Sequence, residues 1–168
     1  EQQELNYLDI ISTLEKSKEY GTYQIDFTGG EPLMYRDLDK LLEYCYLNGF
    51  LVRIFTNLTL FNDNFLNMFK KYGVKEIVTS VDSCHAECHN QFRGVPKSFE
   101  RTIEAIKILK NNINLWTFVT SCGIILLQYT RGKTNETFKT KNEYTVFVYH
   151  IFACGGAFGR VVFRLRKK

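Results

Sequence analysis

The chain has 168 residues, 45% of them hydrophobic and 24% charged, which indicates a soluble globular protein and excludes an intrinsically disordered one. It contains no run of about 18 apolar residues and its N-terminus is polar and acidic, so we expect neither a transmembrane helix nor a signal peptide and predict a cytoplasmic location. The net charge of +4 is unevenly spread: residues 1–113 carry 13 basic against 16 acidic side chains and residues 114–168 carry 9 against 2, which indicates two regions of different origin.

The first 113 residues alternate between helical and strand patterns, with short turns between them. Apolar residues recur at helical spacing in four segments, and β-rich stretches separate these segments. The predicted helices carry apolar faces formed by Leu8, Ile11 and Leu14; by Leu38, Leu41, Leu42 and Cys45; by Phe65, Leu66 and Phe69; and by Ile103, Ile106 and Leu109. The predicted strands span residues 23–27, 50–55 and 75–81.

The ends of these elements carry the expected punctuation. Glycines follow the first three helices, Asn62 or Asp63 caps the third, and Ser98 caps the fourth. Strands separated by single helices favour a parallel sheet with right-handed crossovers. In such a sheet ligands gather at the carboxyl ends of the strands, where the loops converge.

The pattern changes after Asn114, where amphipathic helices cease and the tail from Arg160 is short and basic. We divide the chain into residues 1–114, an α/β region, and residues 115–168, a divergent basic and aromatic-rich segment. One hypothesis is that the second segment is not the native continuation of the first, as after a frame shift. Strand-like stretches in the second region span residues 115–120, 123–129 and 143–152.

The strongest local feature is the turn Thr28-Gly29-Gly30-Glu31-Pro32, which follows the first predicted strand. Its two glycines let a ligand approach the main chain closely, while the exposed carbonyls and Glu31 offer acceptors to an ammonium group. Pro32 fixes the chain as it leaves the turn. The alternative interpretation is an ordinary turn between a strand and a helix.

Further polar segments follow downstream in a fixed order. They are Arg53-Ile54-Phe55-Thr56-Asn57, Thr79-Ser80-Val81-Asp82-Ser83, His89-Asn90-Gln91-Phe92-Arg93-Gly94 and Ser98-Phe99-Glu100. The series, over roughly residues 5–113, resembles the radical S-adenosylmethionine (SAM) enzymes, especially the SPASM-type branch that modifies peptides and proteins. The resemblance implies an α/β fold: part of a TIM-type (β/α) barrel with parallel strands, followed by an irregular C-terminal region.

The resemblance also implies roles in binding SAM. Gly29, Gly30 and Glu31 match the motif that holds the methionine amino group. Asn57 matches a Thr-Asn pair at the end of the next strand, which the family usually follows with glycine and this chain follows with Leu58.

Two more segments match the family's contacts to SAM. Ser80 and Asp82 match a Ser-x-Asp strand end whose polar groups face the ribose and the carboxylate. Arg93 matches an Arg-Gly pair that supplies a cation for the carboxylate. The alternatives are ordinary strand-end turn residues for Ser80 and Asp82, and a solvated surface charge for Arg93.

Family members bind a [4Fe–4S] cluster through three cysteines spaced C-x3-C-x2-C, and the cluster cleaves SAM to a 5′-deoxyadenosyl radical that abstracts hydrogen. We expect this loop to lie upstream of Glu1, so its ligands are not in this chain, and the catalytic residues are unknown from the sequence. Cys84 and Cys88 reproduce C-x3-C, but Gln91 occupies the third position, and we predict no metal site there. Adventitious zinc binding with His85 and His89 is the alternative.

The sequence therefore predicts the central part of a radical SAM oxidoreductase, inactive alone, that uses SAM and, in the complete protein, a [4Fe–4S] cluster. Maturation of a peptide, protein or cofactor is the expected role, with a peptide or protein substrate and an electron donor such as flavodoxin or ferredoxin. One alternative is a degenerate α/β module that keeps residual SAM affinity. Another is a binder of nucleic acid or anionic surfaces through the basic tail, which lacks a recognised binding motif.

Overall fold

The computed structural model describes residues 5–121, 124–130 and 160–165, with side chains described for residues 5–113. The described helices are α1 (Tyr7–Glu19), α2 (Leu38–Leu47), α3 (Asp63–Lys71), α4 (Ala86–Arg93) and α5 (Ser98–Leu109), with one 3-10 turn, η1 (Pro32–Met34). The strands are β1 (Gln24–Gly29), β2 (Leu51–Phe55), β3 (Glu76–Val81), β4 (Asn114–Ser121), β5 (Ile124–Thr130) and β6 (Arg160–Leu165).

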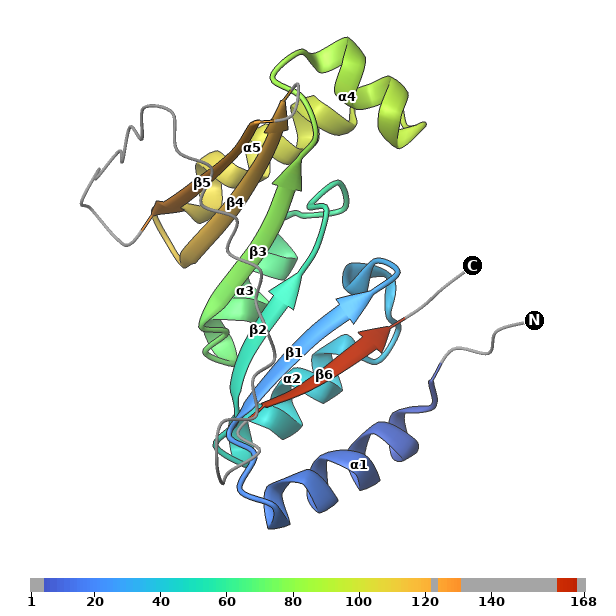
Figure 1. Ribbon diagram of the computed structural model, residues 1–168. Coiled ribbons are helices and arrows are strands. Elements are labelled where there is room, and N and C mark those ends of the chain that lie inside the picture. Colours follow the sequence, from blue (N-terminus) through green and yellow to red (C-terminus); the bar gives the residue numbers. More distant parts are fainter. Residues whose placement is uncertain (1–4, 122–123, 131–159, 166–168) are drawn as a thin grey trace.

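The strands form one six-stranded sheet in the order β5-β4-β3-β2-β1-β6. Figure 1 shows α2, α3 and α5 on the same face of this sheet. The pairs from β6 through β4 are parallel, which confirms the parallel α/β arrangement predicted for the first region. β5 returns antiparallel to β4 because two residues join them, whereas a parallel connection needs a crossover of a dozen residues or more.

The second region agrees with the sequence in part. The strands expected over residues 115–120 and 123–129 are present as β4 and β5. The strand expected over residues 143–152 lies outside the described residues, and β6 was not expected. β4 begins at Asn114 and so runs across the boundary predicted between residues 114 and 115, and the division of the chain there stays a prediction.

The core lies between the sheet and the helices, and α2 shows how the sequence pattern forms it. All four residues of its predicted apolar face are buried, and Cys45 is fully enclosed. Burial raises the pKa of the Cys45 thiol to about 12, so this cysteine acts as a small neutral apolar residue, as expected. The largest fully buried side chains are Phe27, Phe69, Ile10, Leu14, Ile25, Leu41, Leu42, Ile54, Leu58, Ile77 and Leu109.

Two helical faces differ from the prediction. In α1 the buried face is formed by Ile10, Leu14 and Ser17, whereas Leu8 is 69% exposed. The side chain of Asn6 caps this helix, so Leu8 lies in the first turn, beyond the edge of the core. An i, i+3, i+6 pattern drifts around a helix of 3.6 residues per turn, and the i+4 and i+7 positions share a face better.

α5 departs from its prediction in a similar way. Ser98 is its first residue and not its cap, and the buried face consists of Leu109, as predicted, with the smaller residues Ser98, Thr102 and Ala105. Ile103 and Ile106 are only half-buried. The cap comes instead from Asn90 of α4, whose Oδ1 accepts hydrogen bonds from the Ser98 hydroxyl (2.9 Å) and the Phe99 N–H (2.8 Å).

α4 has no counterpart in the predicted elements. His89 is its one buried side chain, so it shows no apolar periodicity. The helix ends at Gly94, which adopts a left-handed conformation with φ of 65°. It lies beyond the carboxyl end of β3, as Figure 1 shows. None of the helices in the described ranges is long and apolar enough to cross a membrane.

Candidate functional site

The carboxyl ends of β1, β2 and β3 lie at one edge of the sheet because these strands are parallel and adjacent. A cavity of about 260 Å³ opens at this edge. It is lined by Gly30, Glu31, Phe55, Thr56, Asn57, Val78, Thr79, Ser80 and Arg93. Five of the seven residues predicted to bind the cofactor therefore line one cavity, while Gly29 and Asp82 adjoin lining residues without lining it.

The turn after β1 shows why glycine is required there. Gly29 has a φ of 128°, a conformation that residues with a side chain rarely adopt. The turn brings Glu31 to the cap position of η1, where its carboxylate Oε1 accepts a hydrogen bond from the Leu33 N–H (3.1 Å). Pro32 follows as the first residue of η1, a position that suits its fixed φ.

Glu31 also joins the ends of two strands. Its Oε1 accepts a hydrogen bond from the Thr56 hydroxyl (2.5 Å), and its Oε2 accepts one from the Asn57 N–H (2.9 Å). A carboxylate offers about four lone-pair sites. These two hydrogen bonds and the one from the Leu33 N–H use three of them. Glu31 is therefore both a clamp between β1 and β2 and an acceptor with capacity for one further donor.

In the loop after β2, Leu58 stands at the position where the family that the sequence resembles usually has glycine. Leu58 adopts a left-handed conformation with φ of 62°, which costs a residue with a side chain about 1–2 kcal/mol. Its side chain is only 1% exposed, so burial in the core offsets that cost. The Asn57 Oδ1 accepts from the Thr59 N–H (2.9 Å) and hydroxyl (2.6 Å), and the Thr102 hydroxyl donates to the Asn57 carbonyl (2.8 Å).

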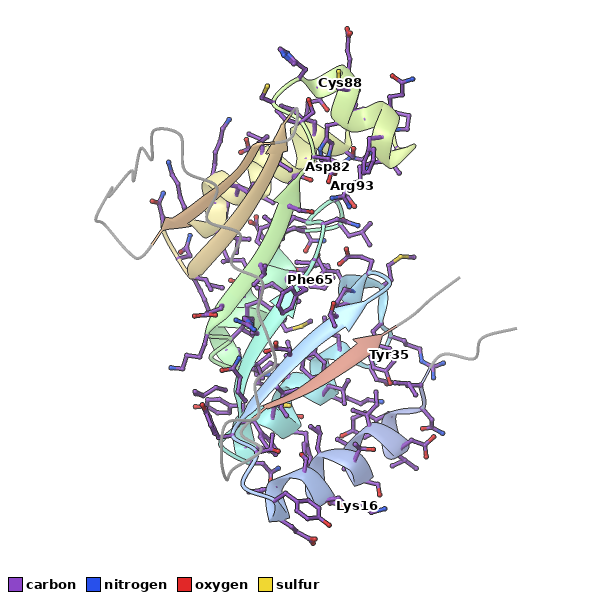
Figure 2. All side chains as sticks on the ribbon, in the orientation of Figure 1. Lys16, Tyr35, Phe65, Asp82, Cys88 and Arg93 are labelled. Atoms are coloured by element: carbon purple, nitrogen blue, oxygen red, sulfur yellow. The ribbon has the colours of Figure 1, made fainter. Side chains whose placement is uncertain are left out.

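The end of β3 carries a second polar cluster, formed by Ser80, Asp82 and Arg93. Arg93 is the last residue of α4, and its Nη2 donates to the Ser80 hydroxyl (2.7 Å) while its Nε donates to the Asp82 Oδ2. Figure 2 shows Asp82 and Arg93 next to each other beyond the end of β3. Ser80 and Asp82 thus orient a half-buried guanidinium whose remaining N–H groups are available to a ligand.

Two residues that the sequence analysis did not place in the site support these clusters. Thr56 is 6% exposed and holds Glu31 through its hydroxyl. His89 is 1% exposed, and its Nδ1 accepts a hydrogen bond from the Asp82 N–H (3.1 Å). Thr56 lies beside Asn57 at the strand end, and His89 lies four residues before Arg93 on the same helix. Those two spacings were the signals available in the sequence.

The charges of the cavity are separated across β2. The Glu31 carboxylate lies on the side of β1, and the Arg93 guanidinium lies on the side of β3. An anion and a cation on two sides of one small cavity match the ammonium and carboxylate groups of an α-amino acid. The described residues therefore fit the methionine part of SAM.

The same residues do not fit an iron–sulfur cluster. In the part of the chain that the structure describes, no three His, Cys, Asp or Glu side chains are grouped to hold a metal ion. Cys84 and Cys88 are exposed at the surface, with Cys88 on α4 as labelled in Figure 2. His89 is turned toward the end of β3, where its Nδ1 is occupied by the Asp82 N–H.

Comparison with known proteins adds independent information. The family model of the Radical SAM superfamily matches residues 1–139. The chain is 30% identical over 125 residues to the AdoMet-dependent heme synthase of Methanosarcina barkeri, which covers 74% of this chain and 35% of the relative. It is 34% identical over 93 residues to AlbA, the antilisterial bacteriocin subtilosin biosynthesis protein of Bacillus subtilis, covering 55% of this chain and 21% of that protein.

A second AdoMet-dependent heme synthase, from Oleidesulfovibrio alaskensis, is 34% identical over 107 residues, which is 64% of this chain and 28% of the relative. The chain thus spans between about a fifth and about a third of the length of these curated relatives.

Proposed function

The chain belongs to the radical SAM superfamily, and we propose that its cavity at the carboxyl ends of β1, β2 and β3 binds the amino-acid part of SAM. The observation that carries this proposal is the pairing of Glu31 and Arg93 on two sides of that cavity. Each has a second task within the protein, since Glu31 joins two strand ends and Arg93 joins α4 to β3. These contacts orient both side chains at the cavity before a ligand binds.

The proposed contacts follow from the groups that remain available. Glu31 keeps one lone-pair site, and with the carbonyl of Gly30 it accepts hydrogen bonds from the ammonium group of SAM. Arg93 has five N–H donors and uses one of them on Ser80 and one on Asp82, so the others donate to the carboxylate of SAM. Both interactions are charge-assisted, which makes them stronger than hydrogen bonds between neutral groups.

The complete protein is proposed to be an oxidoreductase that matures a peptide, protein or cofactor. In this family, bound SAM is the source of the 5′-deoxyadenosyl radical that abstracts hydrogen from the substrate. Two kinds of relatives support the proposal by their names, one for heme synthesis and one for bacteriocin biosynthesis. A peptide or protein substrate and a flavodoxin or ferredoxin as electron donor belong to the same proposal.

A calorimetric comparison of two ligands tests the proposed site. S-adenosylhomocysteine carries the amino-acid group, and 5′-methylthioadenosine lacks it, while both have a neutral sulfur. We expect the first to bind at least tenfold more tightly, because one charge-assisted pair contributes about that much. Glu31→Gln and Arg93→Met remove one partner each, so each should weaken S-adenosylhomocysteine and leave 5′-methylthioadenosine unchanged.

Two exposed residues supply matched controls. Glu104→Gln and Arg101→Met make the same chemical changes on the outer face of α5, and both variants should bind like the unmodified chain. Equal affinity for the two ligands, or an equal loss of both in the site variants, would place the amino-acid group outside this cavity.

A further inference from the structure

α4 is attached to the rest of the protein by polar contacts. Its one buried side chain is His89, while Phe92, the large apolar residue beside it, is 76% exposed. Asn90 caps α5, and Arg93 reaches the end of β3. A helix that buries so little apolar surface keeps its position through these hydrogen bonds. The place of Arg93 in the cavity therefore depends on how α4 is held.

His89 makes the contact between α4 and the main chain after β3. Its Nδ1 accepts the Asp82 N–H at 3.1 Å, which a nitrogen does only when it carries no proton. The imidazole is therefore neutral with its proton on Nε2. The ring of Phe99 packs edge-on against it with ring centres 5.6 Å apart, which fixes its plane from the side of α5.

The Asp82 Oδ2 atom links His89 to Arg93. This oxygen accepts the hydrogen bond from Arg93 Nε, and it lies 3.6 Å from the His89 Nδ1. While His89 is neutral, its Nδ1 holds the main chain of Asp82 and does not compete for that oxygen. A protonated Nδ1 would lose the main-chain bond and become a second donor directed at the oxygen that holds Arg93.

We propose that neutral His89 is a positioning residue of the SAM site, which fixes Asp82 and through it Arg93, so that ligand affinity falls when His89 is protonated. This inference rests on the proposed function, because His89 touches no ligand itself and acts only by holding Arg93 in place for SAM. Protonation exchanges one partner of Asp82 for another and turns Arg93 out of the geometry that faces the carboxylate of SAM.

The surroundings of His89 keep it neutral near pH 7. Burial is the largest influence and lowers the pKa of the imidazole below its usual value of 6.5. Among the described residues, the charged groups that act on it are Asp82 after β3 and Glu100 on α5, which favour the protonated form, and Arg93 on α4, which opposes it. The exchange is therefore expected below pH 6.5.

Nuclear magnetic resonance on the ligand-free chain tests the geometry. Nitrogen shifts of the imidazole should show the proton on Nε2 at pH 7.5. As pH is lowered, the Asp82 N–H and Arg93 Nε–H resonances should shift together. The pH midpoint of both shifts should equal the midpoint of the His89 titration and lie below 6.5. A proton on Nδ1 at pH 7.5, or an Arg93 resonance indifferent to the titration of His89, would overturn the proposal.

Two substitutions test the consequence for binding. His89→Asn places an oxygen at the position of Nδ1 and cannot titrate, whereas His89→Leu places a methyl group there. We expect the affinity for S-adenosylhomocysteine at pH 7.5 to change less than threefold in His89→Asn and to fall roughly tenfold in His89→Leu. As pH falls from 7.5 through the midpoint of His89 that the resonances give, the unmodified chain should lose affinity, and His89→Asn should lose little.

The outcomes separate this inference from the proposed function. If the unmodified chain binds no S-adenosylhomocysteine at pH 7.5, the proposed function fails, while the resonances of Asp82 and Arg93 still decide whether His89 positions them. If it binds, and His89→Leu binds equally well or His89→Asn keeps the full pH dependence, the positioning role is wrong and the site stands.

Discussion

On the β1–β2 side of the cavity, Glu31 is held by two main-chain N–H groups and a buried threonine hydroxyl. On the β3–α4 side, Arg93 is held by the Asp82 carboxylate and the Ser80 hydroxyl, and the main-chain N–H of Asp82 is in turn held by the His89 imidazole. The first side lies in the segments that directly follow β1 and β2. The second side depends on α4, a helix with one buried side chain. The two sides present opposite charges to one ligand and are supported by different means.

The difference indicates a division of labour within the site. Main-chain donors do not titrate and cannot rotate away as a side chain can, so the Glu31 side is coupled to the stability of the fold. Side-chain partners rotate and titrate, so the Arg93 side is coupled to pH and to the docking of α4. Substitutions on the first side should lower the free energy of unfolding most, and those on the second should act mainly on ligand affinity.

The largest loss of stability is expected for Glu31→Gln. The amide keeps one acceptor oxygen and turns two N–H donors toward groups that are themselves donors, so we expect the free energy of unfolding to fall by about 2 kcal/mol. Denaturant unfolding measures this change. Arg93→Met should cost less than half as much, and an equal loss in the two variants would remove the distinction between the two sides.

A smaller loss is expected for Thr56→Val, which keeps the shape of the side chain and removes its hydroxyl. That hydroxyl donates to Glu31 and accepts from the Leu58 N–H (3.0 Å), so we expect unfolding free energy to fall by about 1.5 kcal/mol. Thr13→Val, at an exposed position of α1, is the matched control and should change stability by less than about 0.5 kcal/mol. Equal effects at the two positions would mean that the clamp contributes nothing.

Asn90→Ala should cost about 1 kcal/mol, since it removes the cap of α5. It should also loosen α4 and so weaken the binding of S-adenosylhomocysteine. Thr56→Val should weaken that binding less, although it lowers stability more. Asn67→Ala on the exposed face of α3 controls for the substitution itself. Unaltered ligand affinity in Asn90→Ala would show that the docking of α4 does not govern the Arg93 side.

The smallest effect is the pH dependence of stability that His89 supplies. Its pKa is lower in the folded protein than in the unfolded chain, so the unfolded chain takes up the proton first as pH falls. The contribution is complete above the unfolded pKa, near 6.5, and is lost as pH falls from there through the lower folded pKa. Between pH 7.5 and 5.0 the free energy of unfolding should therefore fall more steeply with falling pH in the unmodified chain than in His89→Asn. Identical slopes of unfolding free energy against pH would contradict this.

The repeated α/β units could be predicted from the sequence because each has a strong local pattern. The apolar stripe of α2 and the parallel order of the first strands follow from helical periodicity and from the helices between strands. α4 could not be predicted, since a helix with one buried side chain has no stripe to detect. β6 pairs with β1 from more than 130 residues away in the chain, a contact that no local pattern encodes.

The site divides in the same way. The Gly29-Gly30-Glu31 turn and the strand-end residues Asn57 and Asp82 could be proposed because they match motifs of the family that the sequence resembles and because parallel strands end at one edge. The contacts that hold these residues in place could not be predicted, because they are hydrogen bonds between distant parts of the chain. Glu31 and Thr56 are 25 residues apart, and only the fold shows that their side chains meet.

The most direct test of the central claim is a crystal structure of the chain with bound SAM. The account predicts the ammonium group of SAM between Glu31 and the Gly30 carbonyl, and its carboxylate against Arg93 in the same cavity. A bound molecule with its amino-acid group outside this cavity, or with its carboxylate turned toward Glu31, would contradict it.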